Sequence, residues 1–223
     1  MKKIMFNDRY GLTQAVLERK KTMTRRIVNY PKKFKGVEDT MLEFNRRIGA
    51  DIYYDCVVCD AADGHKLGQL PLPYEVGDVV AIVQSYESFI DKLYHGQEEN
   101  FANRVLQAHG KKKIGQVAGW RNKMFVKADL MPHHIRITDL WFERLQDISD
   151  DDCLKEGVHV HNPEPGNPNF IGYAYDATPG TNVKRWWFHT PREAFAALIN
   201  RVSGPHTWDG NPWVIAYTFE LVD

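Results

Sequence analysis

A short apolar segment constrains the fold more than any other part of this chain. Residues 79–83 read Val-Val-Ala-Ile-Val and follow the turn residues Val76-Gly77-Asp78. Because polar and apolar residues do not alternate in this run, neither face of the strand is suited to solvent. We therefore predict an inner strand of a β-sheet at residues 79–83.

Strand and helix patterns follow one another irregularly along the rest of the chain. Further strands are predicted at residues 3–6, 22–28, 51–59, 134–142 and 213–222. Helices are predicted at residues 10–20, 38–47, 100–109, 149–157 and 190–203, and loops at residues 60–68 and 159–185. Regular βαβ alternation is missing, which indicates an α+β fold and favours a small β-barrel with flanking short helices.

Composition limits the class of protein. The chain has 223 residues, 43% of them apolar, and a formal net charge of zero. It can therefore bury a core, and only a local patch would attract nucleic acid. No apolar run reaches the roughly 20 residues of a membrane span, and the N-terminus lacks the apolar stretch of a signal peptide. Three cysteines, an odd count, argue against a disulfide framework and favour the cytoplasm.

The stretch between residues 18 and 27 is the strongest candidate for a binding or catalytic site. Lys21 stands three residues before Thr24, and the pair Arg25-Arg26 follows, at a predicted change from helix to strand. Period-two spacing in a strand places Thr24 and Arg26 on one face and Arg25 on the other. These residues could bind an anion, assemble a nucleophile or simply form a polar helix end.

This stretch resembles the signature of the ASCH domain family, which belongs to the PUA-like superfamily of small β-barrels. The family pattern G-x-K-x-x-T-x-R aligns with residues 19–26, so Lys21, Thr24 and Arg26 match while Arg19 replaces the glycine. Residues 76–80 and 136–157 also resemble family segments. Asn211-Pro212-Trp213-Val214 resembles a strand of larger bacterial and phage-encoded members. The resemblance implies one PUA-like domain over residues 1–223, with insertions at residues 31–70 and 91–119.

The resemblance also implies a catalytic set. In ASCH members similar to N4-acetylcytidine amidohydrolases, the working residues are this lysine, this threonine and a glutamate in a short helix, here Lys21, Thr24 and Glu156. A threonine hydroxyl needs an adjacent base, and a desolvated lysine can be that base. Glu156 would act as an acid or orient the lysine. The alternative is that all three only support the turn and the helix end.

Four further residues are candidates for substrate binding. Arg25 and Arg26 could hold a phosphate or a base edge, although ordinary salt bridges would explain them equally well. His159 follows the Glu156 helix and could line the same cleft. Trp186 lies in an aromatic stretch near Lys184-Arg185, a composition that suits a stacking platform for RNA or a nucleoside but also a small satellite core.

Metal sites and cofactors are not expected. Cys56 and Cys59 have the spacing of a zinc knuckle, yet no second pair of ligands follows them. The predicted function is hydrolysis of the N4-acyl amide of a cytidine, with RNA, a nucleoside or a nucleotide as partner and no membrane. The main alternative is a non-catalytic RNA-binding module. A third possibility, a metal-dependent nuclease, is not supported, because the sequence has no compact set of metal-binding carboxylates.

Overall fold

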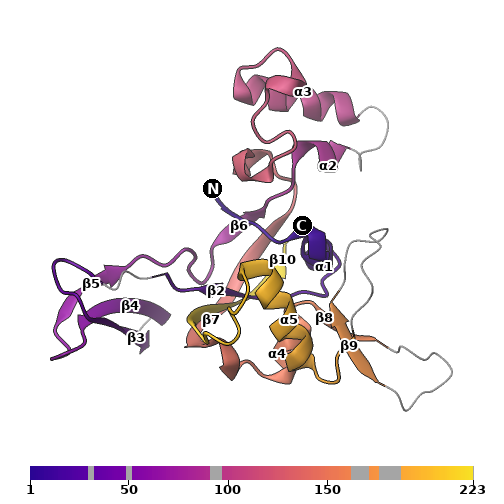
Figure 1. The fold of residues 1–223 in the computed structure, drawn as a ribbon. Helices are drawn as coiled ribbons and strands as arrows, with labels where there is room; N and C mark the ends of the chain where they lie inside the picture. The colour runs from indigo at the N-terminus through magenta and orange to yellow at the C-terminus, as the bar shows by residue number, and fades with distance from the viewer. Residues whose placement is uncertain (30–32, 49–51, 91–96, 162–170, 176–186, 223) are drawn as a thin grey trace.

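A computed structural model describes residues 1–29, 33–48, 52–90, 97–161, 171–175 and 187–222 (Figure 1). Its main sheet has the strand order β1-β6-β7-β10-β2. The strands are β1 (Lys2–Ile4), β2 (Met23–Ile27), β6 (Val79–Ile82), β7 (His134–Arg144) and β10 (Trp213–Leu221). The first pair, β1 and β6, is parallel and the others are antiparallel. The apolar strand is β6, which lies between β1 and β7, so its predicted inner position is confirmed.

A second sheet contains β3 (Thr40–Ile48), β4 (Ile52–Asp60) and β5 (Lys66–Leu70), paired antiparallel in that order. It extends away from the main sheet (Figure 1). The predicted helix at residues 38–47 is therefore wrong. Leu42 and Phe44 are two residues apart and both pack with Cys56 and Val58, which is the period of a strand. The predicted strand at residues 51–59 is confirmed as β4.

Two further strands, β8 (Val158–His161) and β9 (Gly172–Tyr175), pair antiparallel with each other. They correct the prediction of one long loop over residues 159–185, of which residues 162–170 and 176–185 lie outside the described part. Val158 and Ala174 are buried in this pair. The two strands form because they pair with each other across an intervening segment. Local sequence patterns do not predict such a pairing.

The helices are short. They are α1 (Leu12–Leu17), α2 (Tyr86–Ile90), α3 (Gln97–His109), α4 (Asp150–Lys155) and α5 (Pro191–Ser203), with 3₁₀ turns at Asp8–Tyr10, Ile114–Gln116, Lys123–Phe125, Ala128–Leu130 and Leu145–Asp147. As the sequence predicts, the hydroxyls of Ser149 and Thr190 accept backbone N–H bonds at the start of α4 and α5. The Ser149 cap fixes where α4 begins.

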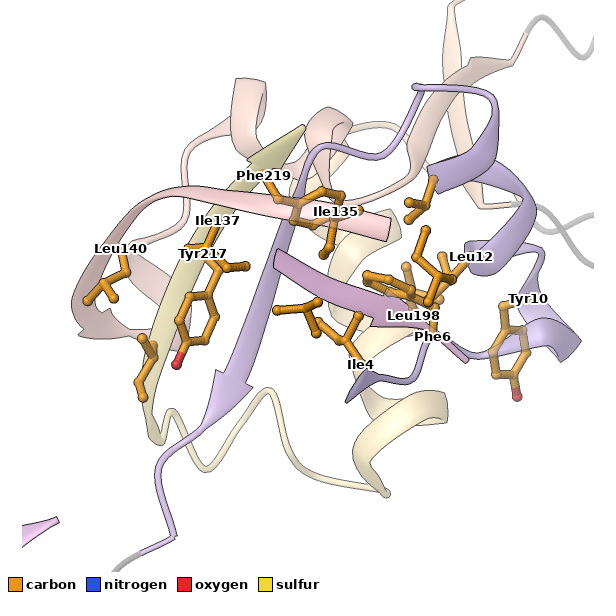
Figure 2. Close-up of a cluster of buried hydrophobic side chains, with 14 residues drawn as sticks. Ile4, Phe6, Tyr10, Leu12, Ile135, Ile137, Leu140, Leu198, Tyr217 and Phe219 are labelled. Carbon is orange, nitrogen blue, oxygen red and sulfur yellow. The ribbon is translucent and has the colours of Figure 1, made fainter. Parts of the chain in front are cut away.

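The largest core cluster lies between the main sheet and helices α1 and α5 (Figure 2). Ile4, Val80, Ile135 and Tyr217 come from four strands of the sheet, and Leu198 comes from α5. Each fully buried side chain of this size contributes about 1.5–3 kcal/mol. The core thereby holds α1 and α5 against the sheet near the start of β2.

The fold is α+β, as predicted. Among the described strands, β1 and β2 are the free edges of the main sheet, so these strands form an open sheet and not a closed barrel. The segment predicted as the first insertion contains the second sheet, and that predicted as the second contains α3. Their status as insertions stays a prediction. None of the described helices combines the length and the apolar character that crossing a membrane requires.

Candidate functional site

Two connections bring the end of α4 against the segment that leads into β2. The backbone N–H of Thr22 donates to the carbonyl of Lys155 at 2.9 Å. The N–H of Lys21 donates to the carbonyl of Ala15, near the end of α1, at 3.0 Å. Because both backbones are fixed at this point, Lys21 and Glu156 face each other although 135 positions separate them in the sequence.

Lys21 and Glu156 form a buried ion pair. The Lys21 amine donates to the Glu156 carboxylate at 2.6 Å and to its backbone carbonyl at 2.7 Å. The side chains are only 2% and 6% exposed. Burial lowers the pKa of Lys21 below its ordinary value by more than the charge of Glu156 raises it. Loss of a proton to give the neutral amine, the form that can accept a proton, is therefore easier for Lys21 than for an exposed lysine.

The second oxygen of Glu156 is bound by Arg25. The Arg25 guanidinium contacts Glu156 at 3.3 Å, Glu143 at 2.6 Å and Asp152 at 3.2 Å, and its side chain is 1% exposed. Burial acts to raise the pKa of Asp152, but its bonds and charge interactions with Lys155 and Arg25 lower it overall. Arg25 therefore fixes the Glu156 carboxylate through the oxygen that Lys21 does not bind.

A small cleft of about 50 Å³ opens on the other side of the ion pair. Its polar wall is formed by Lys21, Thr24, Arg26 and Glu156. The rest of the lining is largely apolar and comes from the segment after β1, from α1 and from α5, namely Met5, Phe6, Asn7, Leu12, Phe195, Leu198, Ile199 and Val202. All three residues of the predicted catalytic set, Lys21, Thr24 and Glu156, therefore line the same cleft.

Thr24 and Arg26 share the cleft face of β2, as period-two spacing predicts. Thr24 is 5% exposed, and its hydroxyl makes no hydrogen bond with any described residue. One Arg26 nitrogen, Nη2, donates to the Met5 carbonyl at 2.9 Å, and the guanidinium lies 5.7 Å from the centre of the Phe6 ring. Its Nε–H is buried and has no partner within the described part of the chain.

A wider pocket of about 400 Å³ adjoins the cleft. Met5, Phe6, Asn7 and Val202 line both, so the two spaces are neighbours. The wider pocket is completed by Asp8, Arg9 and Lys123, and the Lys123 amine donates to the Asp8 carboxylate at 2.7 Å.

The other predicted binding residues do not line the cleft. Arg25 points to its three carboxylates on the opposite side. His159 lies in β8 and is absent from the lining of both spaces. Trp186 lies outside the described residues. Cys56 and Cys59 are buried free thiols, and no group of three His, Cys, Asp or Glu side chains suited to a metal ion occurs within the described ranges.

Sequence reasoning missed several residues that build this site. Asp152 binds Arg25 and stands four residues before Glu156, so helical spacing could have placed both carboxylates on one face. Glu143 reaches Arg25 from β7 and also accepts a bond from the Trp141 indole at 2.8 Å. Phe6 and the α5 residues enter only through the tertiary fold, which gives no local signal.

Comparisons of the chain with protein-family models, with curated proteins and with solved structures found no match.

Proposed function

We propose that this protein is an ASCH-type member of the PUA-like superfamily whose cleft hydrolyses the N4-acyl amide of a cytidine or a related base. One observation carries the proposal: Lys21, Thr24 and Glu156 line a single cleft although Glu156 is more than a hundred positions from the other two. The chemistry needs a nucleophile, a base and a group that orients the base. These three residue types supply those roles.

The backbone at Arg19 supports the resemblance on which this proposal rests. Arg19 stands where the family signature has glycine, and its φ of 58° lies in the left-handed region. Glycine adopts that region without strain, whereas other residues reach it at a cost. The position therefore has the conformation that the signature glycine suits, even though the side chain differs.

In the proposed reaction, the Thr24 oxygen bonds to the acyl carbon while its proton passes to the neutral Lys21 amine. The tetrahedral intermediate collapses, the bond between the acyl carbon and N4 breaks, and N4 takes the proton from the Lys21 ammonium. Water then cleaves the acyl–Thr24 ester, and its proton returns through Lys21 to the Thr24 oxygen. The products are cytidine, a carboxylate and one proton.

Glu156 positions Lys21 in this scheme. Its carboxylate and its carbonyl both accept from the Lys21 amine, so the lysine has one orientation in the cleft. When Lys21 takes the threonine proton, the ammonium is stabilised by a carboxylate 2.6 Å away. Because Arg25 shares the charge of Glu156, the carboxylate does not bind the lysine proton so tightly that it cannot be passed on.

A second candidate, a non-catalytic RNA-binding module, is favoured by one detail. The Thr24 hydroxyl makes no hydrogen bond to Lys21 in the described structure, and both recorded hydrogen bonds of the lysine amine go to Glu156. A permanent ammonium–carboxylate pair would only shape the cleft. In that case Arg26 and the neighbouring aromatic residues would contact single-stranded RNA.

Release of cytidine from N4-acetylcytidine distinguishes the two functions. The amidohydrolase releases cytidine, Thr24→Ala abolishes the release, and Thr22→Ala, the same substitution just before β2 and outside the cleft, retains it. Equal release by the Thr24 and Thr22 variants, or none by the unaltered protein, rejects this enzyme. The binding module instead shows RNA affinity that falls steeply with salt and does not depend on Thr24.

A further inference from the structure

We propose that a basic surface on the helical part of the molecule, outside the cleft, binds the phosphate backbone of a single-stranded polynucleotide. This basic surface is built from β1, the end of α3 and the 3₁₀ turn Lys123–Phe125. Its residues are Lys3, Lys111, Lys112, Lys113, Met124, Phe125 and Lys127. None of them lines the cleft, so the inference does not depend on which function the cleft has.

Positive charge is concentrated in one segment of the chain. Residues 100–128 contain no Asp or Glu. Their cations are Arg104, Lys111, Lys112, Lys113, Arg121, Lys123 and Lys127. The two glutamates in the first turn of α3 stand roughly 18 Å along the helix from Lys111, about twice the Debye length in physiological salt. Because the whole chain has zero net charge, its remaining residues are net acidic, and this segment is the local patch that nucleic acid would require.

The carboxylates that contact the segment are paired with other cations. Asp8 binds Lys123 at 2.7 Å, and Glu87 binds Arg121 at 3.2 Å. Asp129 lies 3.7 Å from the N-terminal ammonium. The lysines of the basic surface, by contrast, form no ion pair with any residue in the described part of the chain. Their charge is therefore available to an external anion.

Lysine amines connect the three segments of the basic surface. The Lys3 amine donates to the carbonyls of Met124 and Val126, at 2.8 and 3.0 Å. The Lys127 amine donates to the carbonyl of Ala108, at the end of α3. All of these acceptors are uncharged, so the bonds position the amines without cancelling their charge. Figure 1 shows α2 and α3 together at one end of the molecule.

His109 shows that the positive charges continue past the end of α3. Burial lowers its pKa, and the charges of Lys127 and Lys111 lower it further. Its Nε2 lies 3.0 Å from the Tyr86 hydroxyl, which also accepts the backbone N–H of Lys127 at 2.8 Å. Like charges held near one another repel, and a phosphate bound between them removes that repulsion.

Two exposed apolar side chains lie beside these amines. Met124 and Phe125 are 59% and 58% exposed, and they stand between Lys123 and Lys127 in the chain. An exposed aromatic ring among lysines suits a single strand, because unpaired bases stack on the ring while the lysines contact the phosphates. The bases of a duplex are already stacked and paired, so the ring favours a single strand.

An anionic membrane fits this surface less well. Proteins that lie on a membrane typically insert the apolar face of an amphipathic helix. The apolar residues of α3, Phe101 and Val105, are instead buried in a core cluster with Tyr86 and Val126. The helix therefore has no apolar face left for a bilayer, and the basic surface is assigned to a polynucleotide.

A salt titration of binding tests the role of the lysines. Fluorescence anisotropy is measured with a labelled RNA and with a DNA of the same sequence, both long enough to cover a site of about 4–16 nucleotides. The triple variant Lys111→Ala, Lys112→Ala and Lys113→Ala should bind more weakly. Each phosphate contact contributes about 0.7 to the slope of log K against log salt, so its slope should become shallower by about 2. Binding of both strands indicates recognition of the backbone alone, and binding of RNA only adds recognition of the sugar.

A second triple variant is the matched control for lost charge. Lys33→Ala, Lys66→Ala and Arg136→Ala remove three exposed cations that lie elsewhere in the chain. This control should keep the affinity and the salt slope of the unaltered protein, and both triple variants should keep its circular dichroism. Equal weakening by the two triple variants, or no binding of either strand at low salt, overturns the proposal.

The stacking residue and the location of the strand are tested in the same assay. Phe125→Ala should weaken binding of a single strand by about fivefold or more, and Met41→Ala, an exposed apolar residue on β3, should not. Equal affinity for duplex and single strand, or binding of phosphatidylserine vesicles without binding of a polynucleotide, overturns the proposal. So does affinity that is lost in Arg26→Gln and kept in the lysine triple variant, since the strand would then lie in the cleft. Cytidine release is measured separately, so failure of the proposed hydrolysis leaves this result standing.

Discussion

The amine of Lys21 donates to two oxygens of the same residue, the carboxylate and the backbone carbonyl of Glu156, at 2.6 and 2.7 Å. A single carboxylate contact would leave the lysine free to rotate about it. With the carbonyl as second acceptor, the position of the amine is set by the backbone at the end of α4. The cleft geometry therefore depends on where that helix stops.

Breaking this pair from one side should destabilise the protein. Lys21→Met leaves a buried carboxylate with Arg25 as its remaining cation, and we expect a loss of about 3 kcal/mol in the free energy of unfolding. The double variant Lys21→Met with Glu156→Leu should recover most of that loss. Urea unfolding of the single and double variants measures the coupling. Purely additive losses would contradict a direct interaction.

Stability should rise with pH through the titration of Lys21. Burial lowers its pKa in the folded protein below 10.5, so between the lowered value and 10.5 the unfolded chain binds more protons. The free energy of unfolding then increases as pH rises through that window. The measurement is the difference in unfolding free energy between the unaltered protein and Lys21→Met, taken at several pH values. A difference that instead shrinks as pH rises would mean that the pair raises this pKa.

The two neighbouring arginines should differ sharply in their effect on stability. Arg25 is 1% exposed and binds three carboxylates, so Arg25→Gln should cost about 3 kcal/mol or more. Arg26→Gln removes one bond to a carbonyl and should cost about 1 kcal/mol. Thermal melting of both variants provides the comparison. Similar losses for both would show that Arg26 also supports the fold.

The three thiols should resist modification in the native protein. Burial raises the pKa of Cys56 to about 11 and that of Cys153 to about 12, so neither forms the reactive thiolate near neutral pH. Cys59 is also buried, and burial raises its pKa as well. A colorimetric thiol reagent should label all three only after denaturation. Rapid labelling of the folded protein would show that one of these sites opens.

Gly157 should tolerate no side chain. Its φ is 107°, and a Cβ there would lie 3.1 Å from Leu12 Cδ2 and 3.7 Å from Lys21 Cδ. Gly157→Ala should therefore destabilise the protein by about 1–2 kcal/mol, because the backbone is strained for a residue with a side chain and Leu12 has to shift. Gly115→Ala, where the added carbon meets nothing within 4 Å, is the matched control. Chemical unfolding of both variants checks the difference.

Local patterns predicted the parts of this fold that depend on neighbouring residues. The caps Ser149 and Thr190 were found because their hydroxyls bond three residues ahead. The helix predicted at residues 38–47 overlooked the spacing of Leu42 and Phe44, because a separation of two residues is the period of a strand and would place them on different faces of a helix. The pairing of β8 with β9 and the contacts of Glu143 depend on residues distant in sequence, so no window along the chain contains them.

The site residues divide in the same way. The spacing of Thr24 and Arg26 placed both on one face of β2, and the resemblance to a family motif added Glu156 from a distant segment. The apolar wall from α5 could not be predicted, because its residues look like an ordinary amphipathic core face. The role of Arg25 as a hub for three carboxylates also required the tertiary structure.

The strand that carries Thr24 has a consequence for the order of folding. β2 is an edge strand whose described partner is β10, far along the sequence. A ribosome therefore exposes Thr24 and Arg26 long before residues 213–221. Until β10 docks, a nascent chain has no fixed β2 and no assembled cleft. Any activity of this site therefore requires that residues 213–221 have been made and have paired with β2.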